Sequence, residues 1–95
     1  MTKVRIKHLS NPKHRDLKLE LGDDKKVEFV KKCLESENAF ETVVETFLEG
    51  TTFDILKKAQ CLDLDASGRK TSWGDVIEVD GDPYMVAEYG FRNLD

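Results

Sequence analysis

The sequence is poor in the residues that build covalent and metal-based sites, with two cysteines and two histidines among 95 residues. Cys33 and Cys61 have no partner spacing and no neighbouring histidine pair, so structural thiols are expected rather than a disulfide or a metal site. No apolar run approaches the roughly 18 residues of a membrane span, and the N-terminus lacks the apolar stretch of a signal peptide. These absences predict a cytoplasmic protein with no cofactor, no metal and no membrane contact.

Motifs for catalysis are missing as well. The sequence has no Gly-x-Ser-x-Gly elbow and no glycine-rich phosphate loop. His8 and His14 lie among Lys and Arg, which disfavours a catalytic imidazolium. Ser72, Asp75 and either histidine could form a triad on paper, but nothing in their spacing supports one. We therefore expect that the protein is not an enzyme.

The net charge of −4 is distributed unevenly. Residues 1–19 hold six Lys or Arg against one acid, residues 20–64 hold six against eleven, and residues 65–95 hold three against seven. The three segments therefore carry +5, −5 and −4. A basic end can contact phosphate, and an acidic face can mimic or repel it. The simpler interpretation is that 36% charged residues keep a small domain soluble.

Hydrophobic periodicity predicts the elements of the N-terminal half. Basic and apolar residues alternate over residues 3–7, which indicates a strand with one face in the core. Leucines alternate with charged residues over residues 17–21, so a second strand is expected, and it could pair with the first as a hairpin. Asp23 or Asp24 can cap a helix that ends near Ser36.

The middle of the chain is less clear. Residues 40–48 fit a helical stripe, yet they are rich in β-branched residues and also fit a strand, which we favour. Thr51 or Thr52 can cap a second helix, and Phe53 is expected in its buried stripe.

The most informative stretch is residues 69–92. It reads as a polar loop, a strand, an Asp-Gly turn at residues 80–81 and a second strand that ends in an aromatic-glycine-aromatic step. This pattern predicts a hairpin with a fixed register.

The order of these elements, β-β-α-β-α-β-β, predicts the fold class. We expect a single α+β domain over residues 1–95, with a mixed or antiparallel sheet, two helices packed on one face and a C-terminal β-hairpin.

The hairpin sequence also resembles a known group. Arg-Lys-Thr-Ser-Trp-Gly-Asp-Val-Ile-Glu-Val-Asp-Gly at residues 69–81, followed by Tyr84, Val86 and Gly90-Phe91, resembles the YodL-like family of small proteins of bacteriophages and conjugative elements. Its members typically show a polar Arg-containing loop, Ser-x-Gly-Asp, an apolar strand, a turn and a strand that ends in Gly-Phe.

With the preceding strand-then-helix pattern, the resemblance covers about residues 42–94, and it favours the strand at residues 40–48. Trp73 departs from the family pattern, which more often has a small aliphatic residue before Gly-Asp. The resemblance implies a mobile-element origin and a fold. It implies no reaction, so no catalytic residue is carried over.

A contact surface is expected at the C-terminal hairpin. Aromatic and arginine side chains gather there in the sequence, and such residues either pack into the core or form interaction surfaces. The candidate surface residues are Arg69, Trp73, Tyr89 and Arg92. Our first hypothesis is a non-enzymatic protein-interaction module from a phage or other mobile element, which binds a host or viral protein in the host-cell cytoplasm.

One alternative uses the acidic residues of the middle segment. Glu41, Glu45 and Glu49 share one side of either a strand or a helix. They could make the protein an acidic nucleic-acid mimic that inhibits a defence nuclease, with binding that weakens steeply as salt is added.

The other alternative uses the basic N-terminal strand. Lys3, Arg5 and Lys7 fall on one face of it, so they could bind nucleic acid. An unpaired edge strand could support a dimer, and the sequence leaves the oligomeric state open.

Overall fold

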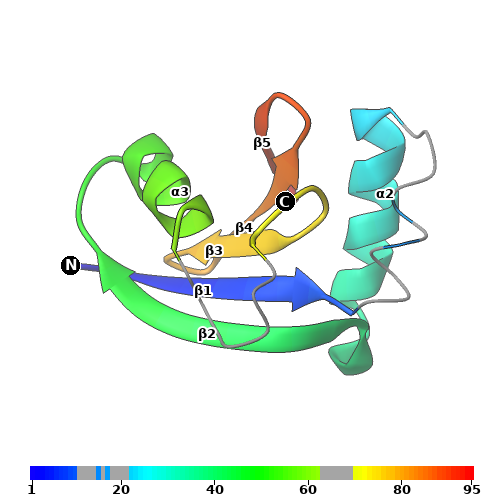
Figure 1. Ribbon diagram of the computed structural model, residues 1–95, viewed down its shortest axis with the longest axis horizontal. Helices are drawn as coiled ribbons and strands as arrows, with labels where there is room; N and C mark the ends of the chain where they lie inside the picture. The colour runs from blue at the N-terminus through cyan, green and yellow to red at the C-terminus, as the bar shows by residue number, and fades with distance from the viewer. Residues whose placement is uncertain (11–14, 16, 18–21, 63–69) are drawn as a thin grey trace.

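The computed structural model describes residues 1–10, 15, 17, 22–62 and 70–95, and Figure 1 shows the strands and helices of this part of the chain. They are β1 (Thr2–Leu9), α2 (Asp23–Leu34), the short 3-10 helix η1 (Glu37–Ala39), β2 (Phe40–Leu48), α3 (Thr52–Gln60), β3 (Val76–Val79), β4 (Asp82–Ala87) and β5 (Gly90–Asn93).

The strands form one five-stranded sheet in the order β2-β1-β3-β4-β5, and every neighbouring pair is antiparallel. This confirms the predicted α+β class with an antiparallel sheet. It also confirms the C-terminal hairpin, because Asp80 and Gly81 join β3 to β4. Their φ angles of 50° and 89° are both positive, as the tight turns of β-hairpins require.

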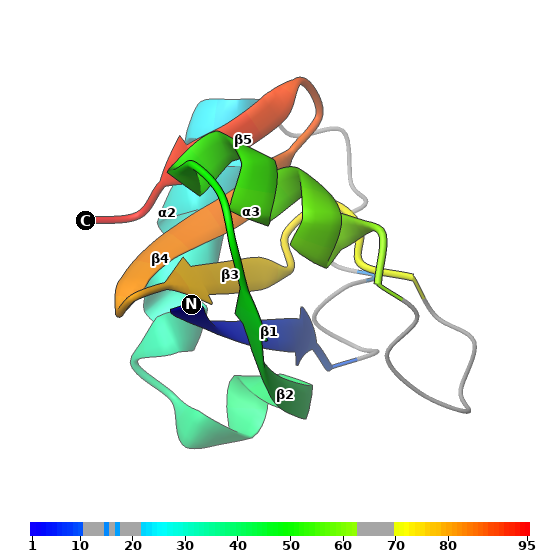
Figure 2. The same cartoon turned by 90° about the vertical axis from the view of Figure 1, so that its left-hand side faces the viewer.

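The two helices cover opposite faces of the sheet, which corrects the prediction that both pack on one face. Val76 of β3 belongs to the cluster under α2, whereas the next residue, Ile77, belongs to the cluster under α3. Successive side chains of a strand point to opposite faces, so the two helices lie on opposite sides of the sheet. Figure 2 shows α3 in front of β4 and α2 behind it.

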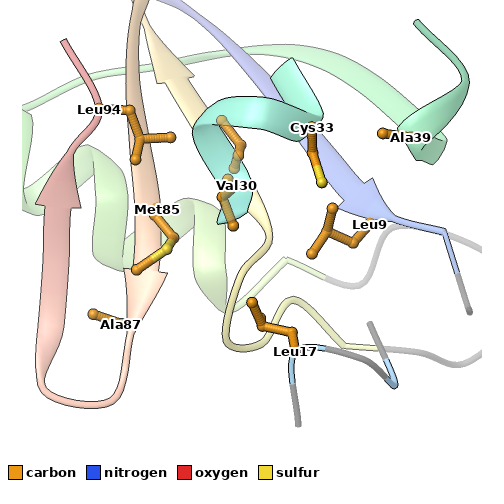
Figure 3. Close-up of a cluster of buried hydrophobic side chains, with 9 residues drawn as sticks. Leu9, Leu17, Val30, Cys33, Ala39, Met85, Ala87 and Leu94 are labelled. Carbon is orange, nitrogen blue, oxygen red and sulfur yellow. The ribbon is translucent and has the colours of Figure 1, made fainter. Parts of the chain in front are cut away.

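The core therefore has two parts. The part under α2, drawn in Figure 3, joins the helix to the ends of β1 and β4 and to the C-terminal segment. Its buried residues are Leu9, Leu17, Val30, Cys33, Ala39, Val76, Met85, Ala87 and Leu94. The buried residues of the part under α3 are Val4, Ile6, Ile55, Leu56, Ala59, Ile77, Val79 and Val86.

The predicted N-terminal hairpin is wrong. Both edges of β1 are already paired, one with β2 and the other with β3, so no further strand can add to it. Leu17, where the second strand was expected to begin, has helical backbone and is buried against the α2 cluster. Residues 18–21 lie outside the described part of the chain.

Residues 40–48 form strand β2, as favoured. The chain then enters α3 through a reciprocal cap. The Asp54 amide donates to the Thr51 hydroxyl at 3.2 Å, and the Thr51 amide donates to the Asp54 carboxylate at 3.4 Å. This capping box satisfies two of the amides that a helix start leaves without partners.

Strand β5 was not predicted from the sequence. The chain reverses at Glu88 and Tyr89, and Gly90 begins β5 with a φ of 89°. The aromatic-glycine-aromatic step is therefore a turn followed by a strand, and it places Tyr89 at the tip of a second hairpin.

Candidate interaction surface

Three of the four predicted surface residues gather at the first turn of α2. The ammonium of Lys26, at the end of that turn, lies 4.5 Å from the centre of the Trp73 ring. The Arg92 guanidinium donates to the Asp24 carboxylate at 2.9 Å. Arg69, the fourth predicted residue, lies outside the described part of the chain. We call the exposed side chains of Trp73, Tyr89 and Arg92 the hairpin surface.

The tip of the second hairpin is tied to the same turn. The Glu88 amide donates to the Asp23 carboxylate at 3.4 Å. Tyr89, next in the chain, is 87% exposed, so its side chain projects into solvent from a tethered turn. Trp73 is 45% exposed, with the Lys26 ammonium against its ring.

The sequence did not predict that Lys26 lies against the ring of Trp73. Lys26 is buried, which is rare for lysine unless its charge is compensated, and the ring of Trp73 supplies part of that compensation. No local signal joins these residues, because 47 positions separate them in the chain.

The loop that carries Trp73 is fixed by a buried carboxylate. Asp75 is 0% exposed, and its two oxygens accept from the Leu9 amide at 2.9 Å and from the Ser72 amide at 2.8 Å. The Gly74 amide donates to the Val86 carbonyl, and the Val86 amide donates to the Asp75 carbonyl. The carboxylate thus extends the ladder between β1 and β3 beyond the last paired residue.

A buried side-chain hydrogen bond anchors the same loop to β1. Nε2 of His8 lies 2.8 Å from Oγ1 of Thr71, and both side chains are buried. His8 and Asp75, which were weighed as members of a triad, therefore hold the loop in place from positions that solvent does not reach.

The structure places the three basic residues of the predicted basic face on one side of β1. Lys3, Arg5 and Lys7 share one face of β1, but two of the three cations are in ion pairs across the sheet. Lys3 pairs with Glu45 of β2 at 2.9 Å, and Lys7 pairs with Glu78 of β3. A phosphate would have to compete with these carboxylates, which weakens the case for nucleic-acid binding.

An apolar groove lies on the opposite face of the sheet, at the start of α3. It has a volume of about 280 Å³ and is lined by Thr52, Phe53, Leu56, Tyr84 and Phe91. The rings of Phe53 and Phe91 meet edge to face with centroids 6.3 Å apart. Phe53 was predicted to be buried but is exposed, because Ile55 and Leu56 occupy the buried side of the helix.

Within the described residues, no three His, Cys, Asp or Glu side chains are grouped as a metal ion would need. No helix in this part of the chain is long and apolar enough to cross a membrane.

Comparisons with protein-family models, with curated proteins and with solved structures gave no match. The resemblance to the YodL-like family therefore stays a hypothesis based on the hairpin motif.

Proposed function

We propose that this protein is a non-enzymatic interaction module that binds a host or viral protein through the hairpin surface. One observation carries the proposal: Tyr89, the most exposed aromatic side chain described, stands at the tip of a turn that one hydrogen bond, from the Glu88 amide to the Asp23 carboxylate, joins to α2. Tyrosine, tryptophan and arginine dominate the binding energy of protein interfaces, and the hairpin surface contains all three.

The tethering of this surface favours binding. A side chain that is already ordered loses less conformational entropy when a partner arrives. Trp73 is held by Lys26 and by the loop that Asp75 fixes, and Arg92 is held by Asp24. Such rigid aromatic anchors bind at low entropic cost.

We further propose an origin in a bacteriophage or another mobile element, with action in the cytoplasm of the host cell. The YodL-like character of residues 69–81 is the basis for this part of the proposal.

Affinity capture with matched variants tests the proposed function. The tagged protein would be incubated with a lysate of the cell in which its gene resides, at low and at moderate salt, and retained proteins would be identified by mass spectrometry. The variant is Tyr89→Ser, and the control is Phe47→Ser, which removes an exposed aromatic from the other end of the sheet.

We expect a protein that the wild type and the control retain at both salt concentrations and that Tyr89→Ser releases. Because Tyr89 is exposed, its replacement should leave the thermal midpoint nearly unchanged. Retention of the same proteins by all three forms would exclude the hairpin surface, and retention of salt-labile nucleic acid alone would exclude a protein partner.

A further inference from the structure

Helix α2 covers only part of its face of the sheet. Ile6 of β1 belongs to the cluster under α3, so its neighbours Arg5 and Lys7 project to the opposite face, on which α2 lies. Figure 1 shows the lower end of α2 beside β1 and β2, and a hollow of about 330 Å³ lies at this place. The described residues that line it are Arg5, Lys7, Leu34, Ser36, Phe40 and Val43.

The hollow is positively charged. Of the described residues that line it, two carry a positive charge and none carries a negative one. Lys7 pairs with Glu78 and lies 5.8 Å from the centre of the Phe40 ring, so its charge is compensated. Arg5 is exposed and has no hydrogen bond or ion pair with any described residue. The guanidinium of Arg5 is therefore the cation that is available to a ligand.

The register of the sheet explains why Arg5 is left over. Glu45 of β2 and Glu78 of β3 both lie directly opposite Arg5. Their carboxylates pair with lysines two positions away along β1 instead, Glu45 with Lys3 at 2.9 Å and Glu78 with Lys7. These five side chains carry three positive and two negative charges. One positive charge is thus unmatched within this group, and it is at Arg5.

Arg5 also lines a second hollow, which fits an anion less well. The second hollow has a volume of about 180 Å³ and is lined by Lys3, Arg5, Glu78 and Gly81. It includes a carboxylate, which repels an anion, and no large apolar side chain. The first hollow, without an acid among its described residues, is the better place for a negatively charged ligand.

The other wall of the first hollow is apolar. Leu34 and Phe40 are half-buried, and Val43 is 49% exposed. These side chains lie beside a free guanidinium, so the hollow favours a ligand with one charged and one apolar end. A water molecule takes about 30 Å³ in the liquid, so the hollow has room for roughly ten non-hydrogen atoms of a ligand. This is the lower end of the range for small-molecule sites.

We propose that this hollow binds a small organic acid, with one carboxylate joined to an aromatic or branched aliphatic group. The planar fork of the Arg5 guanidinium matches both oxygens of a carboxylate, and the apolar group lies against Leu34, Phe40 and Val43. A single unmatched positive charge complements a monoanion better than a phosphate monoester, whose charge is about −1.5 to −2. The site is separate from the hairpin surface and does not depend on it.

A nuclear magnetic resonance titration of the isotope-labelled wild type with phenylacetate tests the proposal. This acid has the required charge, apolar group and size. We expect the amides of residues 5–7, 34–36 and 40–43 to shift with one dissociation constant, in the millimolar range or tighter. Intermolecular NOEs should join the ring protons of the acid to the methyl groups of Leu34 and Val43. Shifts confined to other parts of the chain, or no NOE to these methyl groups, would overturn the proposal.

Related compounds separate the features of the ligand. Phenylacetamide keeps the shape without the charge, acetate keeps the charge without the apolar group, and phenyl phosphate carries a larger negative charge. We expect each of them to bind at least about fivefold more weakly than phenylacetate. Equal or tighter binding of any of the three would refute the assignment to a small organic acid. Tighter binding of N-acetylphenylalanine, which ends like a protein chain, would assign the hollow to a chain terminus instead and overturn the proposal.

Two charge variants locate the carboxylate. Arg5→Gln and Lys25→Gln each remove one positive charge from an exposed side chain, but Lys25 lies in the first turn of α2, at the other end of the helix from the hollow. We expect Arg5→Gln to weaken phenylacetate binding about tenfold or more and Lys25→Gln to stay within about twofold of the wild type. Binding by Arg5→Gln equal to that of the wild type would refute the proposal. If Arg5→Gln does not fold, the titrations of the wild type alone decide.

Discussion

Replacing the buried carboxylate of Asp75 should destabilise the protein more than any other single polar substitution that we consider. The side chain is 0% exposed and accepts from the amides of Leu9 and Ser72. Asp75→Ala leaves both amides without this partner and also opens the space that the carboxylate filled. A buried polar group that loses its partner costs about 1 to 3 kcal/mol, so the two amides together cost roughly 2 to 6 kcal/mol.

Asp75→Asn keeps the shape of the side chain but removes its charge and one of its two acceptor oxygens. The amide of Asn has one oxygen, so only one of the two backbone donors keeps an acceptor, and the other faces an NH2 group. We therefore expect about half the cost of the alanine variant, roughly 1 to 3 kcal/mol. A 95-residue domain has a total stability of about 5 to 14 kcal/mol, so the alanine variant should lose a large part of it.

Urea denaturation measures these losses, and the single tryptophan, Trp73, reports on the same loop. The matched control is Asp82→Asn, because Asp82 is an exposed acid in the same hairpin and its replacement should stay within about 0.5 kcal/mol of the wild type. A loss below about 1 kcal/mol for Asp75→Ala, or an equal loss for the two Asp75 variants, would contradict the bridging role inferred for the carboxylate.

Two further predictions concern a turn and a helix cap. At Gly74, φ is 87° and an added Cβ would lie 2.0 Å from Cδ2 of Leu17, whereas at Gly81, with φ 89°, it would meet no atom within 4 Å. Measured by equilibrium denaturation, the free energy of unfolding should therefore fall more in Gly74→Ala than in Gly81→Ala. Gly81→Ala carries only the backbone penalty of about 1 to 2 kcal/mol. Equal losses in the two variants would contradict the close approach of residue 74 to Leu17. Hydrogen bonds from the side chain and the amide of Thr51 lower the pKa of the Asp54 carboxyl, so its ionised form stabilises the folded state. This contribution is complete above about pH 4 and is lost as the pH falls through the lowered pKa. The melting temperature of Asp54→Asn should accordingly lie below that of the wild type at pH 7, and the two should converge in strong acid.

Local chemistry was enough to predict most of the elements. The Asp-Gly turn, the Thr51 cap and the alternation over residues 3–7 each depend on a few neighbouring residues, and each prediction is confirmed. Residues 17–21 show how this reasoning fails. Their alternation suggests a strand, but a strand needs a partner, and both edges of β1 are taken by strands more than 30 residues away in the chain.

The placement of the helices was wrong for a similar reason. An amphipathic helix shows that one of its sides is buried, but it does not show which face of the sheet covers that side. The sequence of β3 contained the missing signal. Val76, Ile77 and Val79 put apolar side chains on both faces of a four-residue strand, which indicates a sheet covered on both sides.

The sequence predicted the exposed residues of the candidate surface but not the residues of α2 that hold them. Trp73, Tyr89 and Arg92 stood out by residue type and by their nearness to the hairpin turn. Asp24 and Lys26, which hold two of them, belong to a helix about 50 to 70 positions earlier in the sequence and look there like an ordinary acidic start and a solvated lysine. Only the packing of α2 beside the hairpin brings the two sets together.

The uneven charge of the sequence acquires a different meaning in the fold. The basic N-terminal strand, which by itself suggests a phosphate-binding arm, lies second in the sheet between two strands that carry glutamate. Two of its three cations, Lys3 and Lys7, are in ion pairs within the sheet, and β2 forms the margin beside it. The strand order puts β2 at one end of the sheet and the β4–β5 hairpin with Tyr89 at the other.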